Sequence, residues 1–315
     1  MSKIAFIYPG QGAQKAGMGA DFYENSEIAR YIFDQAGEEL DLDMKELCFE
    51  ENDRLDLTEY TQAAMVTTCL AMTRVAESKG LKADITAGLS LGEYPAIAAA
   101  GGMNDMDAIR LVRKRGILMQ NTVPAGEGAM CAVISMAAEE IEKVIEPIAD
   151  VSVANYNCPG QIVITGKTDA VEEAAAKLKE AGARRTIMLN VSGPFHSQML
   201  VPAGEKLAEE LEHTRFHELR IPYVTNVTAE KVTDIRETLG LLTTQISSPV
   251  RWMQSMERMI ADGVDTFVEI GPGKTLEGFL RKIDRSVKVF HISQWEDVDK
   301  VCTELADSGK MMEEA

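Results

Sequence analysis

The 315-residue chain lacks any long hydrophobic run, any paired-cysteine motif and any excess of positive charge. No apolar segment approaches the ~20 residues that a helix needs to cross a bilayer. The short run Ile4–Tyr8 is stopped by Pro9, so it cannot form the core of a signal peptide. The formal net charge of −18 argues against nonspecific binding to nucleic acid or to an anionic membrane. These absences predict a cytoplasmic globular protein.

The cysteines and histidines show no pattern typical of a metal site. The cysteines number five, and none is in C-x-x-C spacing, which is typical of free thiols in a reducing compartment. His213 and His217 are four residues apart, but no cysteine and no settled third ligand accompanies them. We therefore expect two solvated surface histidines and no metal.

The stretch 84–102 carries the most informative motif. A short apolar run ends in the Gly-x-Ser-x-Gly pattern of residues 88–92 and passes into an Ala-rich helix that a glycine pair stops. We predict a strand, a sharp turn and a helix, with Ser90 at the apex and the helix N-terminus favouring negative charge there. This arrangement is typical of a serine nucleophile for acyl transfer. The alternative is a plain Gly-Ser turn before a helix.

The helix predicted over residues 105–120 places an arginine on its apolar face. Arg115 shares that face with Leu111, Val112 and Met119. The guanidinium needs a partner, because an unpaired buried charge is costly. An internal carboxylate is one candidate, and a ligand carboxylate, held by two parallel hydrogen bonds, is the other.

The pattern of residues 125–192 predicts a compact unit with the order β-α-β-β-α-β, the ferredoxin-like arrangement. Strands are expected at 130–134, 151–155, 161–165 and 186–189, and helices at 138–148 and from 168 to about 182. We predict an α/β fold in which this small domain, residues 125–192, is inserted into a large α/β-hydrolase-like domain. The large domain would comprise residues 1–124 and 193–315, with a cleft between the two.

The segments after residue 193 are expected to complete the large domain. His196 follows the small unit directly, so it should lie at the domain junction. Helices are predicted at 199–211, from capping-box residues Asp234 and Glu237 to about Thr244, and from Ser248-Pro249. Strands are predicted at 266–270 and 287–290. The acidic end beyond Trp295 is predicted to be a surface tail. Residues 271–275 imitate a nucleotide-binding loop but lack its upstream glycine, so we reject that function.

Several segments together match a known family, in order and with plausible spacing. They are residues 8–12, the serine motif at 88–94, Arg115 in its helix, 155–161, 194–197, 226–229, Gln245 before Pro249-Val250, and 269–273. On these motifs the chain resembles the malonyl-CoA:acyl carrier protein transacylases of fatty-acid synthesis, over roughly residues 1–293. The combination is far more specific than Gly-x-Ser-x-Gly alone.

The resemblance implies a serine–histidine dyad. Ser90 would be the nucleophile and His196 its general base, oriented by the main-chain carbonyl of Gln245. The backbone N–H groups of Gln11 and Leu91 would form the oxyanion hole. Malonyl-CoA would acylate the serine, and the phosphopantetheine thiol of holo acyl carrier protein would then take the malonyl group, without metal or cofactor.

The resemblance also implies how the acyl donor binds. Arg115 would hold the free carboxylate of the malonyl group, which favours the ligand interpretation of its position. Phe195 resembles the version of the motif that accompanies malonyl, whereas a smaller residue accompanies branched substrates. Asn155 and Asn157 match family positions near the cleft, and Met119 shares the helix face of Arg115.

The carrier proteins of this family are acidic, as is this chain. We therefore predict that the two basic pairs of the sequence form the carrier-docking patch: Arg184 with Arg185, and Arg281 with Lys282. Two solvated pairs without a partner are the alternative, because exposed charges usually contribute little. We expect a monomer.

Two other functions remain open. In a serine thioesterase or hydrolase, water would resolve the acyl-serine; in a related acyltransferase, a different acyl-CoA would be the donor. His291 could complete a hydrolase triad with Ser90, but no acid stands at a recognisable site for it. A non-catalytic carrier-binding module would not need Ser90, His196 and Arg115 together. Many family members have histidine in place of Leu89, and we expect this departure to tune the activity without abolishing it.

Overall fold

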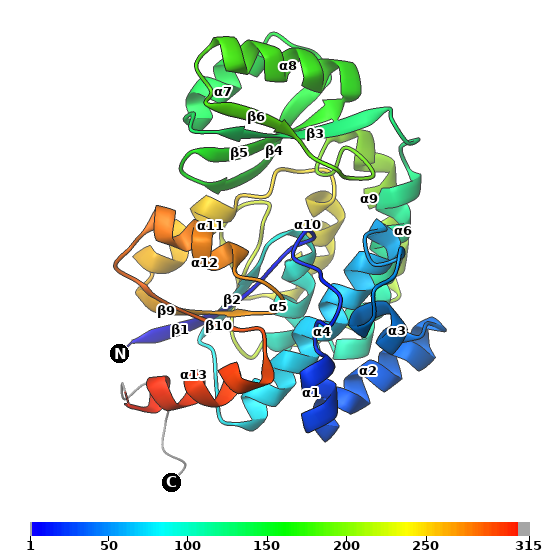
Figure 1. Ribbon diagram of the computed structural model, residues 1–315, viewed down its shortest axis with the longest axis vertical. Coiled ribbons are helices and arrows are strands. Elements are labelled where there is room, and N and C mark those ends of the chain that lie inside the picture. Colours follow the sequence, from blue (N-terminus) through cyan, green and yellow to red (C-terminus); the bar gives the residue numbers. More distant parts are fainter. Residues whose placement is uncertain (1, 308–315) are drawn as a thin grey trace.

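The computed structural model describes residues 2–307 and contains two β-sheets, one above the other in Figure 1. Residues 1 and 308–315, which belong to the predicted large domain and its tail, lie outside the described residues. All six strands of the larger sheet lie outside residues 125–192, and all four strands of the smaller sheet lie within them. The assignment of residues 125–192 as a separate domain stays a prediction. Among the described residues, no helix is both long and apolar enough to span a membrane.

The larger sheet has the order β10-β9-β1-β2-β7-β8. Its strands are β1 (Lys3–Tyr8), β2 (Ile85–Gly88), β7 (Tyr223–Val224), β8 (Lys231–Val232), β9 (Val264–Ile270) and β10 (Lys288–Ile292). Its strand pairs are parallel except for β7 with β8. Strand β1 is a nearly continuous apolar run because both of its faces are buried. Ile4 and Phe6 join the core on one face, while Ala5 and Ile7 join the core on the other.

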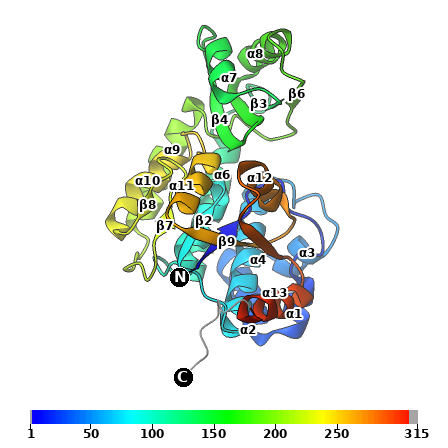
Figure 2. The ribbon, with the colours of Figure 1, turned by 90° about the vertical axis from the view of Figure 1, so that its left-hand side faces the viewer.

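Helices cover both faces of this sheet (Figure 2). On one face α11 (Trp252–Ala261) and α12 (Thr275–Ile283) bury Trp252 and Leu280 against the strands. The other face carries α4 (Thr58–Ser78), α5 (Glu93–Ala99) and α6 (Asp105–Asn121), which share one large core. The remaining helices around this sheet are α1 (Ala20–Asn25), α2 (Glu27–Leu40), α3 (Met44–Phe49), α9 (Val201–Glu212), α10 (Thr238–Gln245) and α13 (Trp295–Asp307).

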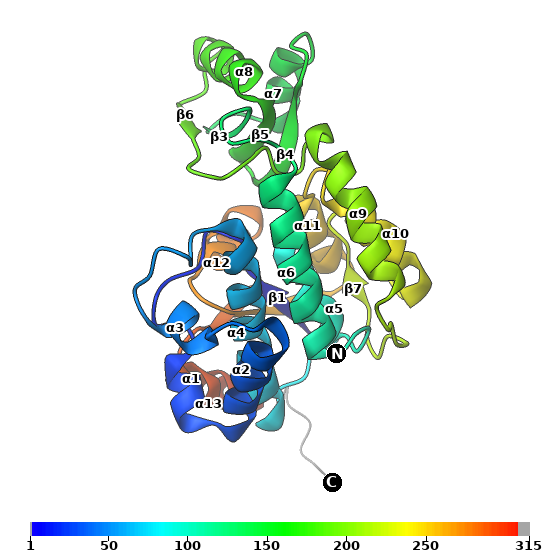
Figure 3. The same cartoon turned by 90° about the vertical axis from the view of Figure 1, so that its right-hand side faces the viewer.

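The smaller sheet is antiparallel and has the order β4-β5-β3-β6. Its strands are β3 (Gly128–Ile134), β4 (Val151–Cys158), β5 (Gln161–Lys167) and β6 (Arg185–Met188), with α7 (Ala138–Ile145) and α8 (Thr168–Glu180) on one face. The predicted ferredoxin-like order is therefore confirmed. On the other face Met130 and Val163 join the core of the larger layer. Figure 3 shows α6 running from that layer up to this sheet.

Three expectations after residue 193 were wrong in detail. The segment beyond Trp295 is the helix α13 as far as Asp307, because Val298, Val301 and Leu305 form an apolar stripe that is buried. The helix expected from Ser248 begins only at Trp252. Asp234 caps a short 3-10 turn before α10, accepting from the N–H of Arg236, so the helix proper starts at Thr238.

Candidate active site

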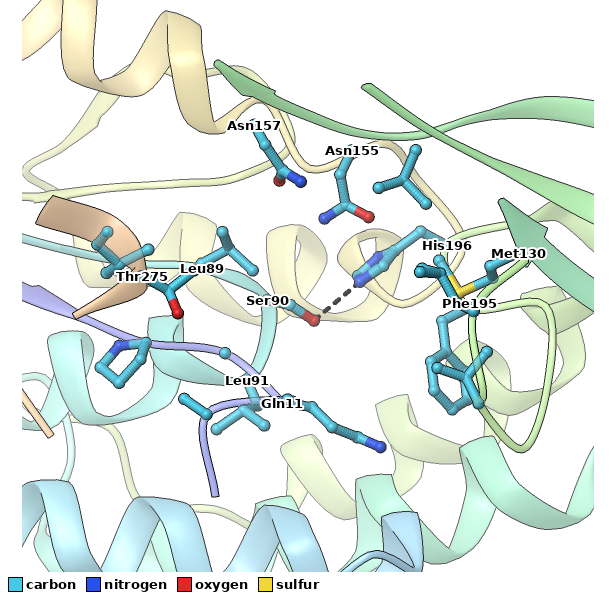
Figure 4. Close-up of a pocket in the computed structure, with 18 of the residues that line it drawn as sticks. Gln11, Leu89, Ser90, Leu91, Met130, Asn155, Asn157, Phe195, His196 and Thr275 are labelled. Atoms are coloured by element: carbon cyan, nitrogen blue, oxygen red, sulfur yellow. Dashed lines mark hydrogen bonds between the residues drawn. The ribbon is translucent and has the colours of Figure 1, made fainter. Parts of the chain in front are cut away.

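A cavity of about 460 Å³ lies between the carboxyl ends of β1 and β2 and the smaller sheet. Its walls include eight of the predicted site residues: Gln11, Ser90, Leu91, Met119, Asn155, Asn157, Phe195 and His196. Figure 4 shows Ser90 and His196 pointing toward each other in this cavity. The fold thus brings residues from both sheets, far apart in sequence, to one place.

Ser90 lies on a sharp turn between β2 and α5, with a left-handed φ of 55°. The flanking glycines are required by space: a Cβ on Gly88 would lie 1.8 Å from the carbonyl oxygen of Gly92, and one on Gly92 would lie 2.4 Å from that of Tyr8. Asn226 holds the turn, accepting from the N–H of Ser90 and donating to the carbonyl of Gly88, both at 2.7 Å. The turn therefore has the geometry that the sequence predicts for a nucleophile elbow.

Ser90 and His196 form the hydrogen-bonded pair on which the site is built. The Ser90 Oγ lies 2.8 Å from His196 Nε2, and His196 Nδ1 lies 3.0 Å from the main-chain oxygen of Gln245. Because a carbonyl can only accept, Nδ1 carries the proton and Nε2 is left to accept from the serine. His196 also has a left-handed φ, 61°, so both members of the pair occupy strained backbone.

The surroundings keep His196 uncharged. Burial, together with the nearby charge of Arg115, lowers the pKa of His196 from 6.5 to about 4. At neutral pH the imidazole therefore carries no charge, and its Nε2 lone pair faces the hydroxyl. This is the protonation state that a general base needs before the reaction starts.

Arg115 is fully buried beside the serine, without a carboxylate in direct contact. Its Nη2 donates to Ser90 Oγ at 3.1 Å and to Gln245 Oε1 at 2.9 Å, and its Nη1 donates to Gln62 Oε1 at 2.8 Å. Among residues 2–307 it forms no ion pair, so an internal carboxylate partner is absent at contact distance. The carboxylate of Glu93 is linked to it only through the Gln245 amide, whose Nε2 donates to Glu93 Oε2 at 2.8 Å.

Three buried polar residues of the site were missed by sequence analysis: Gln62, Glu93 and Asn226. Burial raises the pKa of Glu93 from 4.5 to about 7, while its hydrogen bonds from Gln245 and Asn226 oppose that rise. Glu93 is the one acidic residue of α5, a helix buried along its length, so an acid in an apolar segment was the available signal. Gln62 carried no comparable signal, because glutamine is ordinary in a helix such as α4.

The predicted oxyanion-hole residues and four of the predicted substrate residues line the cavity: Gln11, Leu91, Met119, Asn155, Asn157 and Phe195. Gln11 follows β1 and Leu91 follows Ser90, at the ends of two neighbouring strands. Asn157 is nearly buried, and its side-chain oxygen has no hydrogen-bond partner within the described chain. Met119 accepts from Gln62 Nε2 on its sulfur at 3.4 Å, and Phe195 is buried in the wall.

The predicted docking residues lie outside the cavity. Arg184 and Arg185 are exposed at the start of β6, and Arg281 and Lys282 are exposed on α12, where Arg281 pairs with Glu277. Figures 2 and 3 place β6 and α12 on the same side of the molecule, β6 above and α12 below. One pair therefore lies at the edge strand of the smaller sheet and the other on a helix that covers the larger sheet.

The alternative histidine sites find no support in the geometry. His291 lies near Glu277 and Asp297, and the hydroxyl of Ser90 is bonded to His196 instead. His213 and His217 stand at and just beyond the end of α9. In the part of the chain that the structure describes, no group of three or more potential ligand residues is placed to hold a metal ion.

Comparisons with known proteins agree over nearly the whole chain. The acyl transferase domain family matches residues 5–298. The malonyl CoA-acyl carrier protein transacylase of Bacillus subtilis is 44% identical over 304 residues, covering 95% of this chain and 96% of that protein. The crystal structure of the Clostridium perfringens transacylase of that name is 42% identical, covers 98% of both chains and superposes with a TM-score of 0.94. A malonyl-transacylase in complex with a type II PKS acyl-carrier protein is 35% identical, with a TM-score of 0.93 over 96% of this chain and 100% of that one.

Proposed function

The chain belongs to the acyl transferase domain family, and from this premise we propose that it moves a malonyl group from malonyl-CoA to an acyl carrier protein in fatty-acid biosynthesis. One observation carries the proposal. The Ser90 hydroxyl lies between a base and a cation, 2.8 Å from His196 Nε2 and 3.1 Å from Arg115 Nη2. A nucleophile in that position suits an acyl group that itself ends in a carboxylate.

In the first half-reaction the Ser90 Oγ attacks the thioester carbonyl of malonyl-CoA while His196 takes the hydroxyl proton. The tetrahedral oxyanion is stabilised by the backbone N–H groups of Gln11 and Leu91. The C–S bond then breaks, and the coenzyme A thiolate receives the proton from His196 Nε2. A malonyl ester on Ser90 remains.

In the second half-reaction the phosphopantetheine thiol of the carrier attacks the ester carbonyl. His196 takes the thiol proton and returns a proton to Ser90 Oγ as the ester bond breaks, so the enzyme ends as it began. No metal or cofactor takes part in this scheme.

Arg115 binds the malonyl carboxylate, which a single methylene separates from the reacting carbonyl. In the free protein, neutral acceptors on Gln62, Ser90 and Gln245 occupy its Nη atoms. A carboxylate displaces one or more of them, because a charged acceptor bonds a guanidinium more strongly. The bound carboxylate also offsets the positive charge beside His196, which raises the pKa of the base as the substrate arrives.

The test is the intact mass of the protein after brief incubation with malonyl-CoA. We expect a malonyl adduct on the wild type, no adduct on Ser90→Ala, and loss of the adduct on addition of holo acyl carrier protein. An adduct that decays equally fast without the carrier would identify a hydrolase. Loading by another acyl-CoA in place of malonyl-CoA would refute the role of Arg115.

The two basic pairs are proposed to dock the acidic carrier. Charge reversal at Arg184 with Arg185 and at Arg281 with Lys282 should raise the KM for the carrier and leave malonyl loading unchanged. Reversal of the exposed Lys177 and Lys179 on α8 is the matched control for either pair, because it changes the net charge as much as the reversal of one pair does, at a different surface. Equal effects of the test and control reversals would refute the docking site.

A further inference from the structure

The backbone N–H and carbonyl of Ser90, the proposed nucleophile, are part of a closed ring of hydrogen bonds. The N–H of Ser90 donates to Asn226 Oδ1 at 2.7 Å, and its carbonyl accepts from Gln245 Nε2 at 2.9 Å. Both partners converge on one carboxylate oxygen, Glu93 Oε2, which accepts from the N–H of Asn226 at 3.1 Å and from Gln245 Nε2 at 2.8 Å. The ring therefore runs from Ser90 through Asn226, Glu93 and Gln245 back to Ser90.

The ring bears directly on the oxyanion hole because of peptide geometry. The carbonyl of Ser90 and the N–H of Leu91 belong to one planar peptide unit, so fixing the direction of the first fixes that of the second. The same carbonyl also accepts from the N–H of Glu93 at the start of α5. The side chain of Gln245 is its second donor, from an element more than 150 residues away in sequence.

The orientation of the Gln245 amide is decided by the groups around it. Its Nε2 faces two acceptors, the Ser90 carbonyl and the Glu93 carboxylate, while its Oε1 faces the Arg115 guanidinium, which can only donate. A reversed amide would lose all three bonds. Its main-chain oxygen meanwhile holds His196, so this one residue contacts Ser90, His196 and Arg115.

We infer that Glu93 is a positioning residue for acyl transfer: its buried carboxylate, acting through Gln245 and Asn226, fixes the Ser90–Leu91 peptide for the oxyanion and Arg115 for the acyl carboxylate. The inference rests on the proposed function for the second of these effects. Glu93 is fully buried, and its other oxygen, Oε1, has no hydrogen-bond partner within the described chain. The hydrogen bonds that Oε2 accepts come from Asn226 and Gln245, the two residues that hold the turn.

The charged and titratable groups around Glu93 are few. Burial raises the pKa of the Glu93 carboxyl, and the charge of Arg115 on α6 opposes part of that rise. Burial likewise raises the pKa of Tyr94 on α5 and of Tyr223 on β7, and the charge of Glu93 adds to both shifts. Neither tyrosine titrates near neutral pH. The Arg115 guanidinium is thus a positive charge that the Glu93 carboxylate offsets.

The test is the rate at which a fluorophosphonate labels Ser90, because that reaction needs the serine, the histidine and the oxyanion hole but no malonyl group. Glu93→Ala and Gln245→Ala should each slow labelling by on the order of 100-fold, the cost of losing one oriented oxyanion donor. The double variant should be no slower than Gln245→Ala alone by more than about threefold, because both changes open the same ring. Malonyl loading should fall further than labelling, because Arg115 also loses its orientation.

Two further variants separate positioning from general stability. Glu93→Gln keeps an oxygen that accepts from both donors, so it should restore labelling to within about fivefold of the wild type. Thr86→Val removes another buried hydrogen bond to α5, from Thr86 Oγ1 to the Ala96 carbonyl at 2.8 Å, and should lower the Tm without slowing labelling.

Several results would overturn the inference. These are a Gln245→Ala protein that labels at the wild-type rate, additive losses in the double variant, or a Glu93→Gln protein as slow as Glu93→Ala. If Glu93→Ala does not fold, the Gln245→Ala and Glu93→Gln rates decide alone. A wild type that labels with fluorophosphonate but never loads malonyl would refute the proposed function and leave the positioning of the oxyanion hole to be judged by the labelling rates.

Discussion

Two strand–turn–helix units lie near each other in the larger sheet, and each contains a buried glutamate. In the first, β2 turns through Ser90 into α5, which begins with Glu93; in the second, β9 carries Glu269 and turns through a glycine-rich loop into α12. Burial raises the pKa of both carboxyls from 4.5 to about 7. Both units also contribute residues to the walls of the same cavity.

The two glutamates differ in their hydrogen-bond partners, and the difference distinguishes stabilisation of a helix from positioning of the reactive serine. Both oxygens of Glu269 accept backbone N–H groups of the first turn of α12, Oε1 from Leu276 at 3.1 Å and Oε2 from Glu277 at 2.8 Å. This is a local helix cap that satisfies N–H groups at the start of the helix. Glu93 bonds instead to Asn226 and Gln245, which lie more than 130 positions away in the chain. The first arrangement stabilises a helix, and the second orients a reactive turn.

The largest contrast is expected at the two turns themselves. Ser90→Ala should lower the rate of acyl transfer by roughly 10⁴-fold or more, because the covalent step loses its nucleophile. Thr275→Ala changes the exposed first residue of α12, directly after the glycine-rich turn, and should change the rate by about threefold or less. Transfer assays with both purified variants measure this, and a comparable loss at Thr275 would give the second turn a chemical role.

Substitution of the two glutamates should have different effects: Glu269→Ala should lower mainly the stability, and Glu93→Ala should lower mainly the labelling rate. Glu269→Ala leaves two N–H groups of α12 without their acceptor, so we expect a loss of roughly 2–5 kcal/mol in the free energy of unfolding. The labelling rate of the protein that remains folded should stay close to that of the wild type, in contrast to Glu93→Ala. Urea unfolding and fluorophosphonate labelling of the same samples test both halves. A large rate loss at unchanged stability would mean that Glu269 also positions the site.

The charge of Arg115 should affect how the rate of Ser90 labelling depends on pH. With the pKa of His196 near 4, labelling of Ser90 should fall only below about pH 4, as the base becomes protonated. Burial is the larger cause of that low pKa and Arg115 the next, so Arg115→Ala should raise it and move the acid limb upward by about one pH unit. Arg113→Ala is the matched control, because Arg113 lies on the same helix and pairs with Glu59. An acid limb that moves downward in Arg115→Ala would contradict the electrostatic explanation.

The parts of the site that sequence analysis predicted are those with local signatures. The Gly-x-Ser-x-Gly turn can be recognised in the sequence because its two glycines are required: a Cβ on Gly88 or Gly92 would overlap the backbone. The ferredoxin-like order was readable because each of its strands and helices has its own period and its own turn. Arg115 was found because a charge on an apolar helix face violates the pattern of that helix.

The parts that sequence analysis missed depend on contacts between distant segments. Nothing near Asn226 or Gln245 in the chain indicates that their side chains meet at the carboxylate of Glu93. The tail prediction failed for a related reason: the acidic composition after Trp295 hid an apolar stripe that binds the core. The ring of Trp295 packs edge-on against Phe22 of α1, at 5.7 Å between ring centres. The acidic composition reflects the exposed face of this helix, whereas its buried residues Val298, Val301 and Leu305 make it pack against the core.

The smallest expected effect is a gain in stability from a glycine substitution in α12, the helix of the second unit. Gly278 is an exposed residue inside α12, and a Cβ there would meet nothing within 4 Å. Gly278→Ala should therefore stabilise the protein by about 0.5–1 kcal/mol, since alanine restricts the unfolded chain and favours the helix. Differential scanning calorimetry should show a small rise in Tm with no change in transfer rate. The equivalent change at Gly88 places a Cβ 1.8 Å from a carbonyl oxygen and should prevent the turn from forming. A glycine is thus dispensable in the helix that Glu269 caps and indispensable in the turn that the Glu93 ring holds.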